Sequence, residues 1–469
     1  MTLKKTLLLC PALFLIFTSA STPDGHAQQA REWLTTSSRS AILAPQTSAA
    51  FSDAAPNQPV IDVNDMEQYQ SMEGFGFALT GGSAQLLMRM SPEKRQALLE
   101  ELFAPMGDGI RVSYLRVSIG SSDMNDHPYT YDDVAAGESD PELKKFSLER
   151  DRADVIPVLK AILAINPRVM ILGSPWSAPA WMKTNDALKG GQLKPEDYGA
   201  YANYFVKYIE AMAREGITVN AITVQNEPLN PKNTPGMAMF WDEEDAFIAK
   251  YLGPAFRKAG IKTGIQVYDH NTDVPSYALS ILADPVANPY VEGSAFHLYG
   301  GDTATMTRVH DEYPKKDLFL TEQSVTEPAD SPTLDIDEPV DRVMIGATRN
   351  WCRNVLLWNL AADPNAGPHT NDGGCTECRG ALTLNGDRVT RNVAYYVLAH
   401  FSKFVPPGSI RIGSTTLEQL DNVAFLTPEG KVVLVVASTG NFQKRFEVRY
   451  HGRTLKAELP PESVGTWVW

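Results

Sequence analysis

The sequence lacks an excess of positive charge, internal repeats and low-complexity tracts. It carries 42 Lys and Arg against 56 Asp and Glu, a formal net charge of −14. Most of the surface would therefore repel a polyanion, and no basic run offsets this, which argues against a nucleic-acid-binding protein. The absence of a repeat excludes a solenoid. An apolar fraction of 43% and a charged fraction of 21% exclude a disordered or fibrous chain.

Long apolar runs are missing everywhere except at the N-terminus. Two lysines precede an apolar run over 7–17, which is followed by small residues. This order predicts a secretory signal peptide, cleaved after Ala20 or after Ala27; the alternative is an N-terminal membrane anchor, for which the run is short. We therefore expect 1–27 to be a signal and cleavage region. The mature protein is then secreted or periplasmic, without stable membrane insertion.

Cysteine is scarce. Cys10 lies in the predicted signal, which leaves Cys352, Cys375 and Cys378. An odd number in an exported protein implies at least one unpaired thiol. The segment GGCTECRG allows a local disulfide between Cys375 and Cys378, a redox pair or half of a metal site, although zinc would need more ligands and only His369 is near in sequence. We favour the disulfide, because exported proteins meet oxidising conditions.

Eight short apolar runs alternate with helical patterns along most of the chain. Most of the runs are near-continuous rather than alternating, which is typical of parallel strands covered on both faces. Helical spacing is clearest over 91–103, 147–165 and 194–216. This alternation predicts an α/β fold, a (β/α)8 TIM barrel over residues 73–402. The predicted strands are 74–79, 114–120, 169–176, 221–227, 263–269, 292–299, 317–324 and 354–361.

The pattern changes over residues 403–469, where short strands are separated by turns. Pro-Glu-Gly at 428–430 lies between two apolar runs, which is typical of a hairpin. Another strand, 59–65, precedes the barrel and has no helix beside it. We predict a β-sandwich domain built mostly from the C-terminus, to which the segment 28–72 contributes this strand.

Two glutamates stand at the ends of the fourth and seventh predicted strands. Glu227 lies in TVQNEP and Glu322 in LFLTEQS. The carboxyl ends of barrel strands carry the active site, and strands four and seven lie across the mouth from each other. Glycoside hydrolysis requires two facing carboxyl groups, one protonated to donate to the leaving oxygen and one ionised to attack or to activate water. The alternative is that each glutamate only caps a strand end or forms an ion pair.

With these motifs in place, the sequence resembles glycoside hydrolase family 30, whose members include glucosylceramidases and β-1,6-glucanases. The resemblance implies a barrel with an attached β-sandwich, in agreement with the strand pattern. The matching stretches follow the family's order and cover nearly all of the expected mature chain. They are GFGFALTGGSA (74–84), LRVSIGSSDM (115–124), GSPWSAPAWMKTN (173–185), NEP (226–228), FHLY (296–299), TEQS (321–324), WNLA (358–361) and HFSKFVPPGSIRI (400–412).

The resemblance implies roles for the residues around the two glutamates. Glu227 would be the general acid/base and Glu322 the nucleophile. Asn226 would hold the sugar 2-hydroxyl, where hydrogen bonds strengthen in the transition state. Tyr299 would donate to the nucleophile, and Arg116 would lie beneath it as a positive partner that keeps it ionised.

The resemblance also implies a pocket for one glucose. Asp123 and Trp176 would bind its outer hydroxyls, and Trp358 would supply an apolar ring face on the other side. The alternative for the two tryptophans is that they are buried only as core anchors. His297 is expected to be a core histidine with its hydrogen bonds satisfied, without a role in the chemistry.

The loop after the eighth predicted strand, DPNAGPHTNDGGCTECRGALTLNG, matches β-1,6-glucan-cleaving members of the family more closely than glucosylceramidases. Asn371 is a candidate for the family's asparagine in this loop. The loop, the polar stretch 185–197 and the export signal favour glucan over glucosylceramide, because none of them offers the apolar rim that a lipid would need.

We therefore predict an exported retaining hydrolase of β-D-glucosidic bonds that needs no cofactor and no metal. The substrate is β-1,6-glucan or a related β-glucoside; the alternative is glucosylceramide. An alternative of another class is a non-catalytic carbohydrate-binding protein. The presence of Glu227, Glu322 and Asn226 argues against it, because a protein that has lost catalysis often loses such residues. The sequence gives no prediction of endo or exo action or of the oligomeric state.

Overall fold

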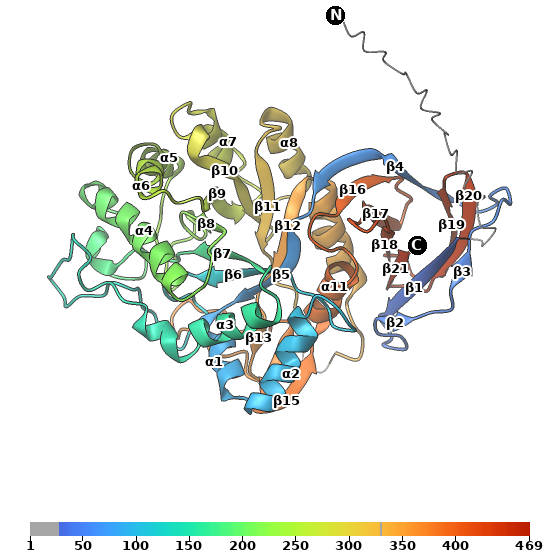
Figure 1. The fold of residues 1–469 in the computed structure, drawn as a ribbon, viewed down its shortest axis with the longest axis horizontal. Helices are drawn as coiled ribbons and strands as arrows, with labels where there is room; N and C mark the ends of the chain where they lie inside the picture. The colour runs from blue at the N-terminus through green and yellow to red at the C-terminus, as the bar shows by residue number, and fades with distance from the viewer. Residues whose placement is uncertain (1–27, 329–330) are drawn as a thin grey trace, which may run out of the picture.

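The structure is a computed structural model that describes residues 28–328 and 331–469. The predicted signal peptide lies outside the described residues. Within them, no helix is both long enough and apolar enough to cross a bilayer. A barrel surrounded by helices occupies one side of the molecule, and a β-sheet domain that contains both the first described strand and the C-terminus occupies the other (Figure 1).

Eight parallel strands close into a barrel, in the order β10-β11-β12-β5-β6-β7-β8-β9. Each of the eight predicted runs overlaps one of these strands, so the predicted (β/α)8 barrel is confirmed. The prediction that strand four extends to residue 227 is wrong, because β8 ends at Thr223 and the next residues form a loop. The barrel strands are β5 (Gly74–Leu79), β6 (Tyr114–Ser118), β7 (Met170–Ser174), β8 (Ala221–Thr223), β9 (Gly264–Asn271), β10 (Val291–His297), β11 (Asp317–Glu322) and β12 (Cys352–Leu357).

The helices cover the outside of the barrel (Figure 1). The three predicted helical segments correspond to α2, α3 and α4, the last two preceded by short 3-10 turns. The stripe of aromatic residues on α4, which includes Tyr201, Tyr204 and Phe205, is fully buried in the core. The longer helices are α1 (Gly81–Arg89), α2 (Pro92–Phe103), α3 (Val155–Ile165), α4 (Tyr198–Arg214), α5 (Trp241–Phe247), α6 (Gly253–Ala259), α7 (Ser276–Ala283), α8 (Ala304–Glu312) and α11 (Val393–Ser402).

The interior of the barrel changes from apolar to polar toward the mouth. Tyr114, Leu172 and Ala221, on adjacent strands, belong to one small apolar cluster. Because side chains of a strand alternate with a period of two, the next inward-facing layer on the same strands contains Arg116, Ser174 and Thr223. Thr223 Oγ1 lies 2.7 Å from Ser174 Oγ, and Arg116 Nε donates to the same oxygen at 3.2 Å. The barrel therefore supports a polar floor below the ends of the strands.

The second domain is a ten-stranded sheet, in which β3 (Ala49–Ala50) pairs with β1 beside the main path of strands. The pre-barrel strand β4 pairs antiparallel with β16 and parallel with β19, and the 428–430 turn joins β17 to β18. Strands from both ends of the sheet share one apolar core. The predicted β-sandwich is therefore confirmed. Its main path is β2 (Ala44–Pro45), β1 (Gln29–Thr36), β21 (Ser463–Val468), β18 (Val432–Ser438), β17 (Leu420–Leu426), β16 (Ile410–Ser414), β4 (Val60–Ser71), β19 (Lys444–Tyr450) and β20 (Arg453–Leu459).

Strand β1 has no counterpart among the predicted strands. It pairs antiparallel with β21, next to the C-terminus. His400 of α11 joins this pair to the barrel, since its ring nitrogens lie 2.8 Å from Thr466 Oγ1 of β21 and 2.8 Å from Thr35 Oγ1 of β1. The two ends of the described chain thus meet against a helix of the barrel.

Candidate active site

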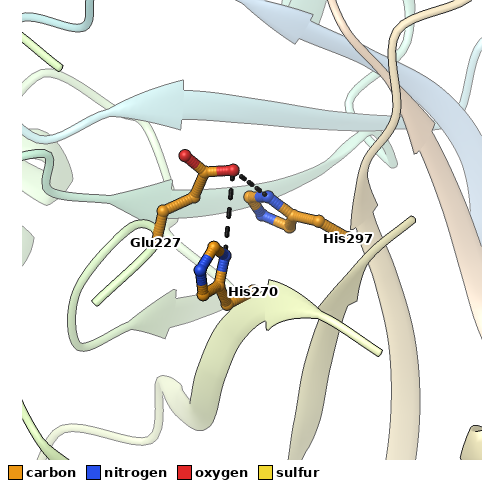
Figure 2. Close-up of side chains that lie close together, drawn as sticks. All are labelled: Glu227, His270 and His297. Atoms are coloured by element: carbon orange, nitrogen blue, oxygen red, sulfur yellow. Dashed lines mark hydrogen bonds and ion pairs between the residues drawn. The ribbon is translucent and has the colours of Figure 1, made fainter. Parts of the chain in front are cut away.

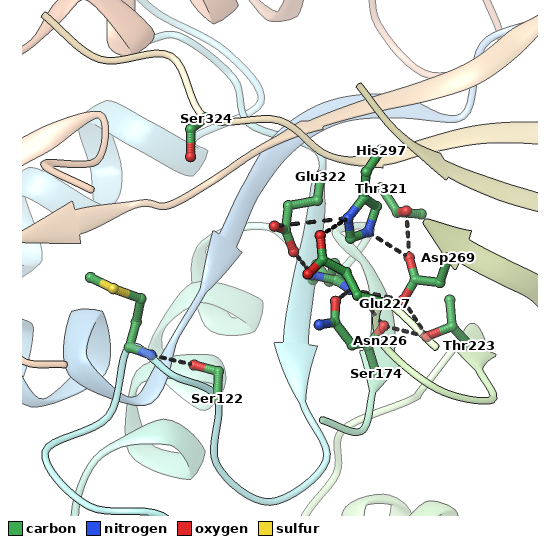
Figure 3. Close-up of polar contacts among 12 residues, drawn as sticks. Ser122, Ser174, Thr223, Asn226, Glu227, Asp269, His297, Thr321, Glu322 and Ser324 are labelled. Atoms are coloured by element: carbon green, nitrogen blue, oxygen red, sulfur yellow. Dashed lines mark hydrogen bonds and ion pairs between the residues drawn. The ribbon is translucent and has the colours of Figure 1, made fainter. Parts of the chain in front are cut away.

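The two glutamates converge at the barrel mouth (Figure 3). Glu322 is the last residue of β11, and Glu227 lies in the loop after β8. Glu227 Oε1 lies 3.2 Å and Glu322 Oε1 lies 3.9 Å from the same atom, Nδ1 of His297. Each glutamate is 7% exposed, so both are largely shielded from water. The structure therefore brings together the two carboxyl groups that the sequence places on opposite strands.

The backbone of the loop after β8 explains how Glu227 reaches this position. Its φ is +44°, a left-handed conformation that is uncommon outside glycine and recurs at functional sites. The N–H of Glu227 donates to the carbonyl of Asp269 at 3.0 Å, and the N–H of Asn226 donates to the carbonyl of Pro175 at 2.8 Å. The neighbouring strand ends β9 and β7 therefore fix the turn that directs Glu227 inward.

Arg116 pairs with Glu322, as the resemblance implies. Its Nη1 donates to Glu322 Oε2 at 2.6 Å, and its Nη2 donates to Asp269 Oδ2 at 2.8 Å and to Asn226 Oδ1 at 2.7 Å. The side chains of Arg116 and Asp269 have no exposed surface. One buried guanidinium thus joins three strand ends through charge-assisted hydrogen bonds.

Glu322 accepts hydrogen bonds on both carboxyl oxygens. Tyr299 Oη donates to its Oε1 at 3.0 Å, and Arg116 holds Oε2. Burial raises the pKa of Glu322, and although the positive His297 and Arg116 lower it, the net shift is upward from the ordinary value. Tyr299 is 45% exposed, whereas Glu322, to which it donates, is 7% exposed.

His297 occupies the centre of the site, whereas the sequence predicts only a core histidine with its hydrogen bonds satisfied. It is fully buried, with Nε2 3.1 Å from Asp269 Oδ1 and Nδ1 3.2 Å from Glu227 Oε1. Burial alone would lower the pKa of this imidazole, but Glu322, Asp269 and Glu227 together raise it to about 9. His297 is therefore a cation near neutral pH.

Glu227 is ionised in the resting site. Burial raises its pKa, but the hydrogen bond and positive charge of His297 outweigh this and lower the pKa to about 2. Asn230 adds a hydrogen bond from Nδ2 to Glu227 Oε2 at 2.7 Å. Burial lowers the pKa of the neighbouring His270, so that ring is neutral near pH 7. His297 is then the positive partner of Glu227.

These pKa shifts run opposite to the expected roles, because a general acid should hold its proton more tightly than the nucleophile does. The hydrogen bonds favour the expected roles. The fixed donors Arg116 and Tyr299 stabilise an ionised Glu322, as a nucleophile requires. The donor to Glu227 is a protonated imidazole, which can supply a proton. On this basis we keep the roles that the family resemblance implies.

Glu227, His270 and His297 form the one group of potential metal ligands identified among the described residues, with ligand atoms within 4.8 Å of one another (Figure 2). His270 Nδ1 lies 3.8 Å from Glu227 Oε1 and has no hydrogen-bond partner in the described part of the chain. A histidine ligand must be neutral, with a free lone pair on the ligating nitrogen. Protonated His297 has none, since its two N–H groups face Glu227 and Asp269. We therefore interpret the group as a proton-binding network.

The remaining sugar-binding candidates lie together beside this network. The rings of Trp176 and Trp358 have centroids 5.5 Å apart, and the guanidinium of Arg116 lies 4.7 Å from the centre of the Trp176 ring. Both tryptophans belong to a small cluster separate from the main core. Asp123 is buried, and burial, with the nearby Glu322 and Glu227, raises its pKa to about 7.

The loop after β12 lies against this pocket. Cys375 and Cys378 form a disulfide within it. The N–H of Cys375 donates to the Asp123 carboxyl group, and Cys378 packs in the cluster with the two tryptophans. Asn371 is exposed in the same loop. Among the residues that the structure describes, Cys352 is free and buried.

Asp269, His270 and Asn230 complete the site, and none of them is among the residues expected from the sequence. Asp269 and His270 stand near the end of β9, where a polar pair follows an apolar run in VYDHN. Asp269 also accepts from Thr223 Oγ1 at 2.7 Å and from Thr321 Oγ1 at 2.6 Å. The signal that identified Glu227 and Glu322, polarity at a strand end, is therefore present at Asp269 too.

Comparison with known proteins identifies the family of the chain. The model for the glycosyl hydrolase family 30 TIM-barrel domain matches residues 72–405, and the model for the family 30 beta-sandwich domain matches residues 408–467. Among solved structures, the endo-β1,6-glucanase BT3312 is similar, with a TM-score of 0.87 and 35% identity, covering 94% of this chain and 99% of that one.

Two curated relatives carry two different activities in their names. Endo-1,6-beta-D-glucanase neg1 of Aspergillus fumigatus is 35% identical over 437 residues, covering 88% of this chain and 87% of its own. Lysosomal acid glucosylceramidase of Mus musculus is 31% identical over 431 residues, covering 86% and 82%. With both domain models matched, this chain belongs to glycoside hydrolase family 30 and is a glycoside hydrolase that acts on carbohydrate substrates.

Proposed function

We propose that the protein is an exported, retaining hydrolase of β-1,6-glucan. The observation that carries the mechanism is the convergence of Glu227 and Glu322 on His297, with Arg116 and Tyr299 donating to Glu322. Glycoside hydrolysis requires two carboxyl groups that face one small volume, and retention through a glycosyl ester on Glu322 is part of the proposal.

In the first step of the proposed reaction, the carboxylate of Glu322 attacks the anomeric carbon while Glu227 protonates the leaving oxygen. Asn226, held through its Oδ1 by Arg116, has its amide N–H groups available for the sugar 2-hydroxyl. In the second step, Glu227 takes a proton from a water molecule whose oxygen bonds to the anomeric carbon. The ester bond to Glu322 breaks, and the sugar leaves with its original β configuration. Asp123, Trp176 and Trp358 would bind the glucose unit during both steps.

The rim of the site favours a glucan over a lipid-linked sugar. Lys189, in the loop after β7, forms an ion pair with Asp372 of the disulfide loop, with 2.5 Å between Nζ and Oδ1. Both side chains are substantially exposed, so the rim is charged where these loops meet. A ceramide would require exposed apolar surface there. The relative named as a β-1,6-glucanase is also more similar in sequence than the glucosylceramidase.

The proposal is tested by incubating the purified protein with β-1,6-glucan and with fluorescent glucosylceramide side by side. Release of gentio-oligosaccharides by the wild type, but not by Glu322→Gln, would support it. Ceramide release without glucan cleavage would overturn the substrate assignment. NMR of the first product formed from glucan checks the stereochemistry, because an α anomer would exclude retention.

Export forms a separate part of the proposal and rests on the composition of residues 1–27. Expression of the full chain in a bacterial host followed by mass spectrometry of the N-terminus tests it. A mature protein outside the cytoplasm that begins after Ala20 or Ala27 is expected. Retention of the whole segment in the membrane fraction would favour the anchor.

A further inference from the structure

We propose that His297 stores the catalytic proton and exchanges it with Glu227 in each half of the reaction. His297 would act through Glu227 as a positioning residue for the proton and would not contact the substrate. The inference rests on the proposed function, because it assumes that Glu227 is the general acid/base.

The geometry forms a continuous relay (Figures 2 and 3). Asp269 Oδ1 lies 3.1 Å from His297 Nε2, and His297 Nδ1 lies 3.2 Å from Glu227 Oε1. His297 has no exposed surface, so its Nδ1 proton meets a carboxylate rather than bulk water. Asp269 fixes the orientation of the ring, which directs the other nitrogen at Glu227.

The charges that face His297 come from every neighbouring strand end. Glu227, Asp269 and Glu322 are negative and Arg116 is positive, and among the described residues His270 and Tyr299 are further titratable neighbours. With three carboxylates and one guanidinium, the cluster is stabilised by one further positive charge. A proton on His297 supplies that charge and brings the cluster closer to neutrality.

The transfer conserves protons. In the first half-reaction the Nδ1–H bond of His297 breaks, its electron pair stays on nitrogen, and a new O–H bond forms on Glu227. The neutral imidazole keeps its Nε2–H toward Asp269, and Glu227 then passes its proton to the leaving oxygen. In the second half-reaction Glu227 removes a proton from water and returns it to His297. The enzyme therefore ends each turnover with its original protonation.

The same arrangement couples proton release to nucleophilic attack. Glu322 Oε1 lies 3.9 Å from His297 Nδ1 and helps to stabilise the imidazolium. When Glu322 forms the glycosyl ester, its negative charge is lost, so His297 becomes more acidic at the moment when the leaving oxygen needs a proton. The proton would therefore move to Glu227 as the bond to the leaving group breaks.

The first test replaces His297 by Asn, whose amide can still donate to Glu227 but cannot release a proton. We expect the alkaline limb of the kcat/KM profile to move to lower pH, because the acidic proton must then reside on Glu227 alone. His310→Asn, on the outer helix α8, is the control, and the alkaline limb of its kcat/KM profile should match that of the wild type. An unmoved alkaline limb in His297→Asn would overturn the proposal.

The loss of activity on substrates with different leaving groups distinguishes a defect in proton supply from a general structural defect. With a methyl β-glucoside, His297→Asn should lose about 100-fold or more in kcat/KM, the range of general acid catalysis. With 2,4-dinitrophenyl β-glucoside, which leaves without protonation, the loss should stay below about tenfold. Equal losses on both substrates would contradict the proposal.

A spectroscopic measurement on the wild type tests the proposal even if the His297→Asn variant does not fold. NMR of protein labelled with 15N-histidine should show His297 doubly protonated at pH 7, and Glu227→Gln should shift its titration to lower pH. A neutral His297 at pH 7 would overturn the proposal that His297 holds the catalytic proton. Absence of β-1,6-glucan cleavage by the wild type would instead refute the proposed function, while this measurement would still report on His297.

Discussion

Arg116 and Glu322 form an ion pair in the interior of the barrel, with 2.6 Å between Nη1 and Oε2. The arginine side chain is fully buried, and the same guanidinium also binds Asp269 and Asn226. A charge in this position is stable only because its partners surround it. The pair therefore links the stability of the barrel mouth to the ionisation of Glu322, the proposed nucleophile.

Replacing Arg116 by Met should both inactivate and destabilise the enzyme. Asp269 and Glu322 would lose their common cation, and breaking a buried pair in this way costs about 3–5 kcal/mol of unfolding free energy. Thermal or urea unfolding checks the stability. Arg116→Lys keeps the charge but cannot donate to three partners in a fixed plane, so it should fold better than Met and remain poorly active. Wild-type activity in either variant would contradict this role.

Substitution of each of the two glutamates should reduce activity with a different dependence on the leaving group of the substrate. Glu322→Gln should abolish turnover of aryl β-glucosides altogether, because no glycosyl ester can form. Glu227→Ala should lose most of its activity on substrates with poor leaving groups, which need a proton from the acid. On substrates with activated leaving groups, the rate of the first step should change little. Azide should partly rescue Glu227→Ala, since it can attack the glycosyl-enzyme without a base. Rates measured across a series of aryl glucosides, with and without azide, distinguish the two residues; identical patterns would refute the role assignment.

The acid limb of activity should follow Glu322. Burial places its pKa above the ordinary value of 4.5. Because the proposed nucleophile must be ionised, activity should fall as the pH decreases through this raised pKa. Tyr299→Phe removes a donor to the ionised carboxylate, which raises the pKa further and should move the acid limb upward by about one pH unit. The kcat/KM profile between pH 3 and 8 measures this. Tyr251→Phe, at a partly exposed position on an outer helix, is the control, and a downward shift in Tyr299→Phe would contradict the argument.

The barrel could be predicted from the sequence because parallel strands covered on both faces leave continuous apolar runs. The pair of glutamates could be predicted because a carboxylate after such a run stands out against it. Asp269 carries the same signal at the end of β9, yet polarity at a strand end does not show which side chains share a proton. That depends on distances across the barrel, and here His297 reverses the pKa order expected for Glu227 and Glu322.

Strand β1 and the position of Glu227 could not be predicted for different physical reasons. β1 is stabilised by pairing with β21 at the far end of the chain, so the local pattern of apolar residues does little to indicate a strand. Glu227 lies beyond the end of β8, in a left-handed turn held by hydrogen bonds to other strand ends. Such a turn normally favours glycine, and nothing in the local sequence indicates that a glutamate would adopt it.

Reduction of the Cys375–Cys378 disulfide should weaken substrate binding. The N–H of Cys375 donates to Asp123, and Cys378 packs against the tryptophan pair and lies 3.7 Å from Ser324 Oγ, which in turn contacts Tyr299 Oη at 3.2 Å. A loosened loop would misplace the groups that bind the glucose more than those that cleave its bond. We therefore expect KM to rise about tenfold with a smaller change in kcat, on the scale of one lost hydrogen bond to a charged group.

The measurement compares kinetics with and without a phosphine reductant. A variant with both loop cysteines replaced by serine should resemble the reduced wild type and show no further response to reductant. Cys352→Ala is the control for the buried free thiol, and it should keep the full response, because Cys352 lies on β12 and outside the disulfide loop. If reduction left KM unchanged, or if the serine variant still responded, the disulfide would stiffen the loop without holding Asp123 in place.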